Sequence, residues 1–375
     1  MNSEVGKVPF DREALAEAMS TVMAGRTWWG ELPFELGRGR VKTYALEVNG
    51  SVDENAALRR AMAWAQSLGL TWALTEDRAL ALAWADGVGL FIDVLDPRFW
   101  LVHTTSAAGE VQRLIRRGVW KSRDVDSCWF SWGFLRDLQR EGTALWFKSD
   151  FEGDDLLPTA GVRARRLRVK LEGDEADQAF EELSAIERYR HATALTSVAT
   201  RISAPRLGHV DELAHYRGRF VTVGDSFELH VGFVSGAILR YRELVQGIEN
   251  RFRFAWEGSD ERGVIFDGEV LSIDLGQPLP DLDRFLDGLF SCRDPFRLWA
   301  VPRKVSERLV EAEVVDLHVG ERFRMEIALD HLRLLLPSTV CGNTLLRLIA
   351  NLQHRFDATV GSGALTSQAP VADRE

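Results

Sequence analysis

Cysteine, lysine and long apolar runs are scarce in this 375-residue sequence. Its three cysteines, Cys128, Cys292 and Cys341, have a spacing that forms neither a disulfide framework nor a zinc-ligand set. No apolar run approaches the roughly 18 residues that a membrane-spanning helix needs. Residues 1–9 are polar and lack the apolar core of a secretion signal. We therefore expect a soluble protein of the reducing cytoplasm with no membrane attachment.

Sequence signatures of catalysis and cofactor binding are absent as well. The 31 glycines are dispersed and form no phosphate-binding or dinucleotide-binding loop. Carboxylate pairs occur, but without a partner constellation around them. We expect no cofactor and no bound metal, and a non-enzymatic protein is favoured over an enzyme.

The charge balance argues against a chain dedicated to nucleic acid, because the formal net charge is −10. Arginine outnumbers lysine 40 to 6. Arginine suits phosphate and carboxylate recognition, although a GC-rich coding bias explains the same excess. Hydrophobic residues make up 46% of the chain, which is enough for two or three domain cores.

The clearest local order lies between Glu269 and Phe356. Period-2 alternation marks strands there, and Asp281 is placed to cap a helix. Gly320-Glu321 has the composition of a hairpin turn. We expect strands at 269–275, 296–301, 308–319, 322–329 and 331–336, and helices that begin at Asp281 and at Cys341.

The same order recurs twice earlier in the chain. The first copy has strands at 41–48, 70–74, 79–84, 90–94 and 99–103, with helices at 53–67 and 108–119. The second has strands at 163–171, 192–202, 220–223 and 227–234, with helices at 174–187 and 236–248. It is one strand short and has an irregular segment at 205–218. Each closing helix begins with a small residue and glycine, at Ala108-Gly109, Ser235-Gly236 and Cys341-Gly342.

These patterns predict an α+β fold of tandem β-α-β(3-4)-α units with mostly antiparallel sheets. By analogy alone, this is the element order of saddle-like and helix-grip folds. The expected divisions are a Trp-rich domain at 1–156, two α+β domains at 157–260 and 261–360, and a disordered tail at 361–375.

Tryptophan is concentrated in the first domain, where 10 of the 12 lie between Trp28 and Trp146. Five of them fall at or beside predicted loops: Trp28, Trp29, Trp120, Trp129 and Trp132. Exposed aromatics near arginine are typical of protein interfaces, and burial in a core is the alternative for each. The leading hypothesis is a binding or assembly protein that recognises a protein or peptide partner, or a second copy of itself.

Two basic stripes support an alternative, a nucleic-acid-binding accessory factor. The first contains Arg113, Arg116 and Arg117, followed by Lys121 and Arg123 near Trp120. The second contains Arg166, Arg168 and Lys170. Basic residues interleaved with aromatics are used by single-stranded nucleic-acid sites, but the acidic residues that flank both stripes weaken their field.

A cryptic enzyme is the third hypothesis. Cys341 at a predicted helix start, with His331 and His354 nearby in sequence, suggests an activated thiol. Its counterparts Ala108 and Ser235 favour a small packing residue instead. His209, Glu212 and His215 have helical spacing of three residues and could offer metal ligands, although a solvated helix face is the favoured interpretation.

Overall fold

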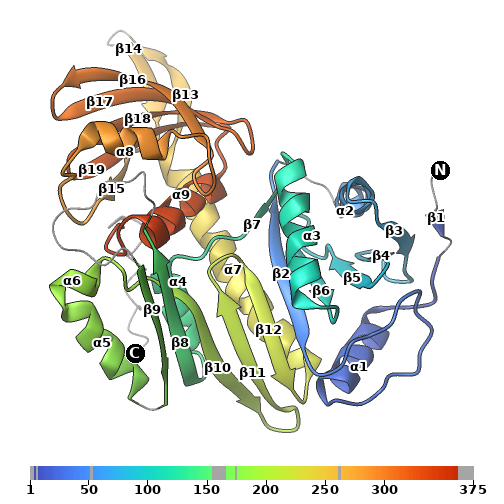
Figure 1. Cartoon of the computed structure of the whole chain (residues 1–375). Helices are drawn as coiled ribbons and strands as arrows, with labels where there is room; N and C mark the ends of the chain where they lie inside the picture. Colours follow the sequence, from blue (N-terminus) through green and yellow to red (C-terminus); the bar gives the residue numbers. More distant parts are fainter. Residues whose placement is uncertain are drawn as a thin grey trace, which may run out of the picture. The chain divides into compact units, whose positions relative to one another are not determined.

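The computed structural model describes residues 4–5, 7–50, 54–153, 166–173, 175–260 and 263–361, and within them the chain is an α+β protein. It divides into two compact units, each assembled from separate segments (Figure 1). Unit 1 comprises 1–128, 134–146 and 197–239, and unit 2 comprises 129–133, 147–196 and 240–375. The division into three consecutive domains stays a prediction.

Unit 1 is built around one mostly antiparallel sheet. Its elements are β1 (Glu4–Val5), α1 (Arg12–Met23), β2 (Val41–Val48), α2 (Glu54–Ser67), β3 (Thr71–Leu74), β4 (Leu80–Ala85), β5 (Val88–Asp93), β6 (Phe99–Thr104), α3 (Ala108–Lys121), β7 (Val125–Ser127), β11 (Gly208–His215) and β12 (Arg219–Gly224). Four elements have residues in both units: α4 (Trp132–Gln139), β8 (Thr143–Glu152), β10 (Leu195–Ala204) and α7 (Phe227–Phe252). The strand order is β1-β3-β4-β5-β6-β2-β12-β11-β10, with β7 also paired to β2.

Strand β2 is the centre of unit 1, and all eight of its residues are buried. Tyr44, Leu46 and Val48 face a core beneath α2 and α3. Val41, on the opposite face, packs in a second core with α1 and the start of α7. Because the side chains of a strand alternate between faces, burial of the whole strand requires both cores.

Unit 2 contains the second sheet. Its elements are β9 (Arg166–Glu172), α5 (Ala176–Ala185), α6 (Glu187–Arg190), β13 (Arg253–Asp260), β14 (Gly263–Asp267), β15 (Leu271–Asp274), α8 (Leu282–Leu289), β16 (Leu298–Ser306), β17 (Leu309–Asp316), β18 (Arg322–Ala328), β19 (His331–Pro337) and α9 (Gly342–Arg355). The strand order is β14-β13-β19-β18-β17-β16, with β15 also paired to β19.

Helices α8 and α9 belong to the core side of this second sheet. Residues Gly342 to His354 of α9 are all buried. Phe285 of α8 meets Phe356, at the end of α9, with ring centroids 5.2 Å apart. A buried ion pair joins Arg347 of α9 to Asp316 at the end of β17. No helix among the described residues is long and apolar enough to span a membrane.

The predictions for the first and last stretches agree closely with the structure. Asp281 caps α8, where its carboxylate accepts a hydrogen bond from the Arg284 amide at 3.0 Å. The two stretches also share a strand order, β3-β4-β5-β6-β2 in one and β16-β17-β18-β19-β15 in the other. In the middle stretch, β12 pairs with β2 instead of with β9. The threefold repeat therefore stays a prediction.

Two predictions in the middle stretch are wrong. The strand expected at 227–234 is the start of α7, a single helix of 26 residues. Ser235-Gly236 consequently lies inside α7 and does not open a helix. The segment 205–218, expected to be irregular, contains β11. In both places a buried polar residue, His230 in α7 and Glu212 in β11, occupies a core position and conceals the apolar period.

Some predictions concern residues outside the described ranges. They include the tail beyond Gly361, the helix starts expected at Asp53 and Asp174, and most of the boundary near residue 156.

Candidate functional site

The sheet of unit 2 has one core face and one solvent-facing face. Along β17 and β18 buried residues alternate with more exposed ones. The inward set includes Val314, Phe323 and Met325, all nearly inaccessible. We call the outward-pointing residues of β16, β17, β18 and β19, together with the adjoining part of β13, the open sheet face.

Strand register places the outward side chains of the open sheet face in rows across the strands. One row consists of Trp299, Val315 and Arg322, and the next of Val301, Glu313, Arg324 and Leu335. A third consists of Arg303, Glu311, Glu326 and Arg333. Side chains in one row are close neighbours, so the apolar residues concentrate in the first two rows and the charged residues in the third.

Large apolar side chains on this face are unusually exposed. Trp299 is 46% exposed and Val301 68%. Trp256 of β13 is 68% exposed. Phe254 pairs with the outward-pointing Pro337, and Trp256, two residues further along β13, lies on the same side. Clustered exposed apolar groups mark interaction sites more often than singly scattered ones do.

A groove of about 420 Å³ lies on the open sheet face, over β13, β17, β18 and β19. Its lining includes Phe254, Leu335 and Pro337, together with Arg322, Arg324 and Glu313. The groove thus combines an apolar floor with two arginines and one glutamate, and it has room for a few side chains of another molecule.

In the part of the chain that the structure describes, some of the arginines on the open sheet face pair with a carboxylate, whereas Arg322 does not. Glu311 accepts hydrogen bonds from Arg303 and Arg324, and these two arginines lower the pKa of its carboxyl group. Arg322 is exposed and has no carboxylate partner among the described residues. A cation is therefore available at the rim of the groove.

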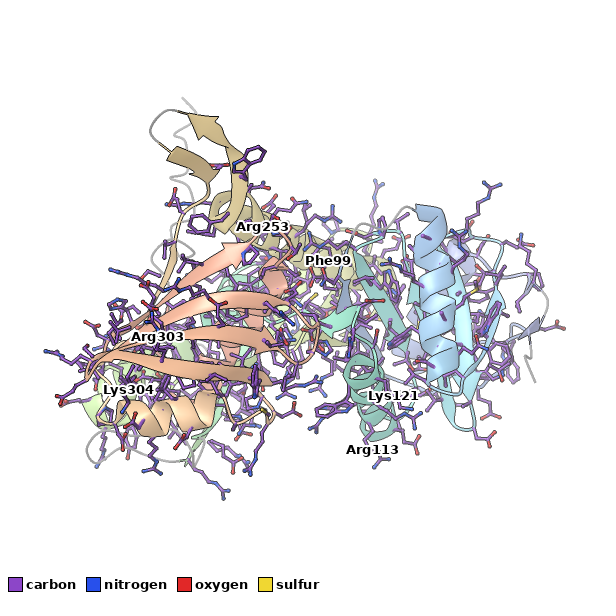
Figure 2. The ribbon with its side chains drawn as sticks, turned by 90° about the horizontal axis from the view of Figure 1, so that it is seen from above. Phe99, Arg113, Lys121, Arg253, Arg303 and Lys304 are labelled. Atoms are coloured by element: carbon purple, nitrogen blue, oxygen red, sulfur yellow. The ribbon has the colours of Figure 1, made fainter. Side chains whose placement is uncertain are left out.

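The outer edge of the sheet is poorly suited to pairing with another strand. Edge strand β16 contains Pro302, which has no amide hydrogen to donate. The exposed Arg303 and Lys304 follow it on the same strand (Figure 2), and Lys304 forms an ion pair with Asp283 at 2.7 Å. Proline and charge are common protections of edge strands, so the face is the more accessible surface for a partner.

The five tryptophans selected from the sequence do not form one surface. Trp29 and Trp120 of unit 1 are exposed, whereas Trp28 is half-buried against Phe10. In unit 2, Trp129 is buried, and its amide donates to the Tyr241 hydroxyl at 2.9 Å. The indole of Trp132 donates to the carbonyl of Ala358 at 2.8 Å.

The exposed tryptophans Trp256 and Trp299 were missed by the sequence reading. The sequence did indicate the position of Trp299. Residues 296–301 were expected to form a strand, and the side chains of a strand alternate between its two faces. Phe296 and Leu298 are on the apolar side of this strand, so Trp299 is on the outward side. No comparable pattern indicated Trp256.

The two basic stripes differ in their surroundings. Arg113, Arg116 and Arg117 share an exposed face of α3 in unit 1. The second stripe is on β9 in unit 2, where each cation has a carboxylate partner. Arg166 pairs with Glu152, Arg168 with Asp150 and Lys170 with Glu172.

The proposed thiol site lacks the expected neighbours. The Cys341 amide donates to Glu321 and the Gly342 amide to Glu249, both at 3.0 Å. Two carboxylates at this helix start disfavour a thiolate. His354 lies 13 residues further along α9, about 20 Å at the helical rise.

The expected trio of metal ligands is separated by its secondary structure. Since β11 is a strand, His209 and His215 point to one face and Glu212 to the other. Glu212 is fully buried and faces the core. Within the described ranges, no cluster of three or more histidine, cysteine, aspartate or glutamate side chains is placed to hold a metal.

Glu212 instead joins a buried network that the sequence did not reveal. Its carboxylate lies 2.9 Å from Nδ1 of His230, and Nε2 of that ring lies 2.6 Å from Oγ1 of Thr43. Oγ1 of Thr43 is also 2.8 Å from Nδ1 of His103. Burial lowers the pKa of His103 to about 3. The Thr43 hydroxyl links the two imidazole rings, and His230 links that hydroxyl to the Glu212 carboxylate.

This network is placed like a nucleophile, base and carboxylate, but all four side chains are inaccessible. It connects β2, β6, β11 and α7 within unit 1. We assign it to the positioning of α7 on the sheet.

Comparison with known sequences places the chain among its relatives. A sequence model of the MJECL33-like protein family matches residues 9–365. The chain belongs to this family. A relative in Methanocaldococcus jannaschii, named uncharacterized protein MJECL33, is 27% identical over 308 residues, which cover 72% of this chain and 74% of the relative. That name states no activity.

Proposed function

We propose that this MJECL33-like protein is a non-enzymatic binding protein that holds a segment of a protein partner on the open sheet face. The observation that carries the proposal is the exposure of Trp256, Trp299 and Val301 on the same sheet face that carries the groove. Tryptophan and arginine are the residues most enriched at the energetic centres of protein interfaces. The open sheet face supplies both.

The chemistry of the groove defines the segment that it accepts. Leu335, Pro337 and Phe254 favour an apolar side chain, and Arg322 favours a carboxylate beside it. Truncation of a tryptophan at such a centre costs about 2–4 kcal/mol of binding free energy. The partner segment should therefore combine an apolar anchor with a neighbouring aspartate or glutamate.

The reducing cytoplasm is the proposed location. Its support is the state of the cysteines, which are free, with Cys128 and Cys341 buried. Burial raises the pKa of the Cys128 thiol well above its ordinary value. The thiol therefore stays protonated, and a protonated thiol is a poor nucleophile.

The test is quantitative affinity purification of the tagged full-length protein from its native host, with and without nuclease. We expect one stoichiometric protein partner that resists nuclease. Trp299→Ala should reduce its recovery about tenfold or more, and Trp29→Ala, a change at an exposed tryptophan of unit 1, should not. A partner that is lost equally in both variants, or that disappears with nuclease, contradicts the proposal.

A further inference from the structure

Helix α3 of unit 1 presents a strongly basic surface. Its exposed side chains Arg113, Arg116, Arg117, Trp120 and Lys121 recur at helical spacing and share one face. We call them the basic helix face. Residues 111–123 contain five cations and no acidic residue. Figure 2 labels Arg113 and Lys121, the first and the last cation of the basic helix face.

The basic helix face is held in place by the packing of the opposite side of α3 against α2. Val111, Ile115 and Gly118 form the buried side of α3. At Gly118 a β-carbon would come within 2.6 Å of the Trp64 ring, so glycine permits the close approach of α2 to α3. The Arg117 guanidinium donates a hydrogen bond to the carbonyl of Leu68 at 2.7 Å. Because Arg117 is held in this contact, we consider Arg113 and Lys121 the better candidates for binding a ligand.

A cavity of about 240 Å³ lies at the C-terminal end of the basic helix face. Lys121 belongs to both, and the cavity lining also includes Arg60, Trp64, Trp100, Ser122 and Asp124. The Trp64 indole N–H is buried and has no hydrogen-bond partner among the described residues. Two indole rings, two cations, two serine hydroxyls and a carboxylate thus line the cavity.

We propose that the basic helix face and this cavity form a nucleotide-binding site. Arg113 and Arg116 contact phosphate groups, since exposed guanidinium groups suit phosphate oxygens. Trp120, 54% exposed between the cations, offers its ring for base stacking. The cavity takes a base above a floor formed by the buried Trp64 and Trp100, where Asp124 and Ser122 can accept and donate hydrogen bonds.

An acidic peptide would satisfy the arginines but not the aromatic surfaces, so the nucleotide is the better fit. The site lies in unit 1 and is independent of the open sheet face in unit 2. Its ligand is either a free mononucleotide or a residue of a single-stranded nucleic acid.

The experiment measures fluorescence anisotropy of a labelled 12-mer oligouridylate with the full-length protein, at salt near 0.15 M and below it. Uridine monophosphate, inorganic polyphosphate and polyglutamate serve as competitors. The test variant is R113A/R116A/K121A. The control is R166A/R168A/K170A, which removes the same number of cations from β9 in unit 2.

We expect the test variant to weaken oligouridylate binding at least tenfold and to reduce the salt slope by about 2, the value for three phosphate contacts to a single strand. The control should change neither. Trp120→Ala should weaken binding by about tenfold or more, and Trp64→Phe should weaken it while preserving the apolar wall.

The competitors separate the sources of the ligand. Competition by uridine monophosphate at micromolar concentration identifies a mononucleotide site, and competition by the oligomer alone identifies a single-strand site. Either supports the proposal. Equal competition by polyphosphate or polyglutamate, with no effect of Trp120→Ala, would show a surface that binds any polyanion and would overturn it. Absence of oligouridylate and mononucleotide binding overturns it as well.

Discussion

The buried hydroxyl of Thr43 provides a sharp test of the network that holds α7. Thr43→Val preserves the shape of the side chain but removes both of its hydrogen bonds. Nε2 of His230 and Nδ1 of His103 then remain buried without their partner. Each unsatisfied buried polar group costs about 1–3 kcal/mol, so we expect the two together to lower the free energy of unfolding by about 2–6 kcal/mol.

The chain offers a matched control on the neighbouring strand. Thr222 of β12 is also fully buried, and it is registered opposite Val41 on the same face of the sheet. Its hydroxyl has no hydrogen-bond partner. Thr222→Val removes a polar group that makes no bond, so stability should stay unchanged or rise slightly. Thr43→Ser retains the hydroxyl and should cost only about 1 kcal/mol for the lost methyl group.

The assay is equilibrium unfolding in urea, followed by circular dichroism and by tryptophan fluorescence. We expect the free energy of unfolding to fall strongly in Thr43→Val, slightly in Thr43→Ser and not at all in Thr222→Val. The slope of the unfolding free energy against urea concentration should be the same in all three variants. Equal stability of the two valine variants would refute the role assigned to the network.

Two further outcomes follow from buried polar groups. The pKa of His103 is about 3 in the folded chain and near 6.5 when unfolded, so the unfolded state binds more protons between these values. Stability should therefore fall as the pH drops from 6.5 to 3, by about 1.4 kcal/mol per pH unit, and a His103→Gln variant measured by urea unfolding should lack this contribution. In unit 2, Asp316→Asn removes the carboxylate that forms an ion pair with the buried Arg347 and should cost about 3–5 kcal/mol. The double variant Asp316→Leu/Arg347→Met should recover most of that loss in thermal unfolding, and a double variant no more stable than the single one would contradict this.

The part of the fold that could be predicted is the part where polarity and burial agree. From β15 to α9, the buried strand positions are apolar almost throughout, so alternation located each strand. Asp281 capped its helix as the local pattern indicated. Local signals were sufficient there because the inward side carries few charges, Lys304 on β16 and Asp316 at the end of β17.

The prediction failed where two polar residues, Glu212 and His230, occupy buried positions. In α7 the buried positions Phe227, His230, Val234 and Tyr241 have a helical period, but the segment 227–234 was predicted to be a strand. In β11 the buried Glu212 interrupts the alternation in the same way. Each residue is satisfied by the other, at 2.9 Å, across 18 positions of sequence. This contact is part of the tertiary structure, so it cannot be predicted from the local sequence pattern around either residue.

The candidate site was recoverable only in part. Strands β16 to β19 of the open sheet face were predicted, and their parity distinguishes its outward residues. The adjoining part of β13 was not predicted as a strand. Which face lacks a helical cover depends on the packing of α8 and α9, and this is decided by contacts such as Phe285 with Phe356. The choice among exposed tryptophans could therefore not be made before the structure was known.

Site-specific photo-crosslinking tests the central claim most directly. A photoreactive amino acid is placed at position 299 or, as the control, at position 29 of the full-length protein, which is then irradiated in its native host. Crosslinking from position 299 to one partner segment that carries an apolar residue beside a carboxylate, with none from position 29, is the predicted result. Equal crosslinking at both positions, or none at position 299, would contradict binding at the open sheet face.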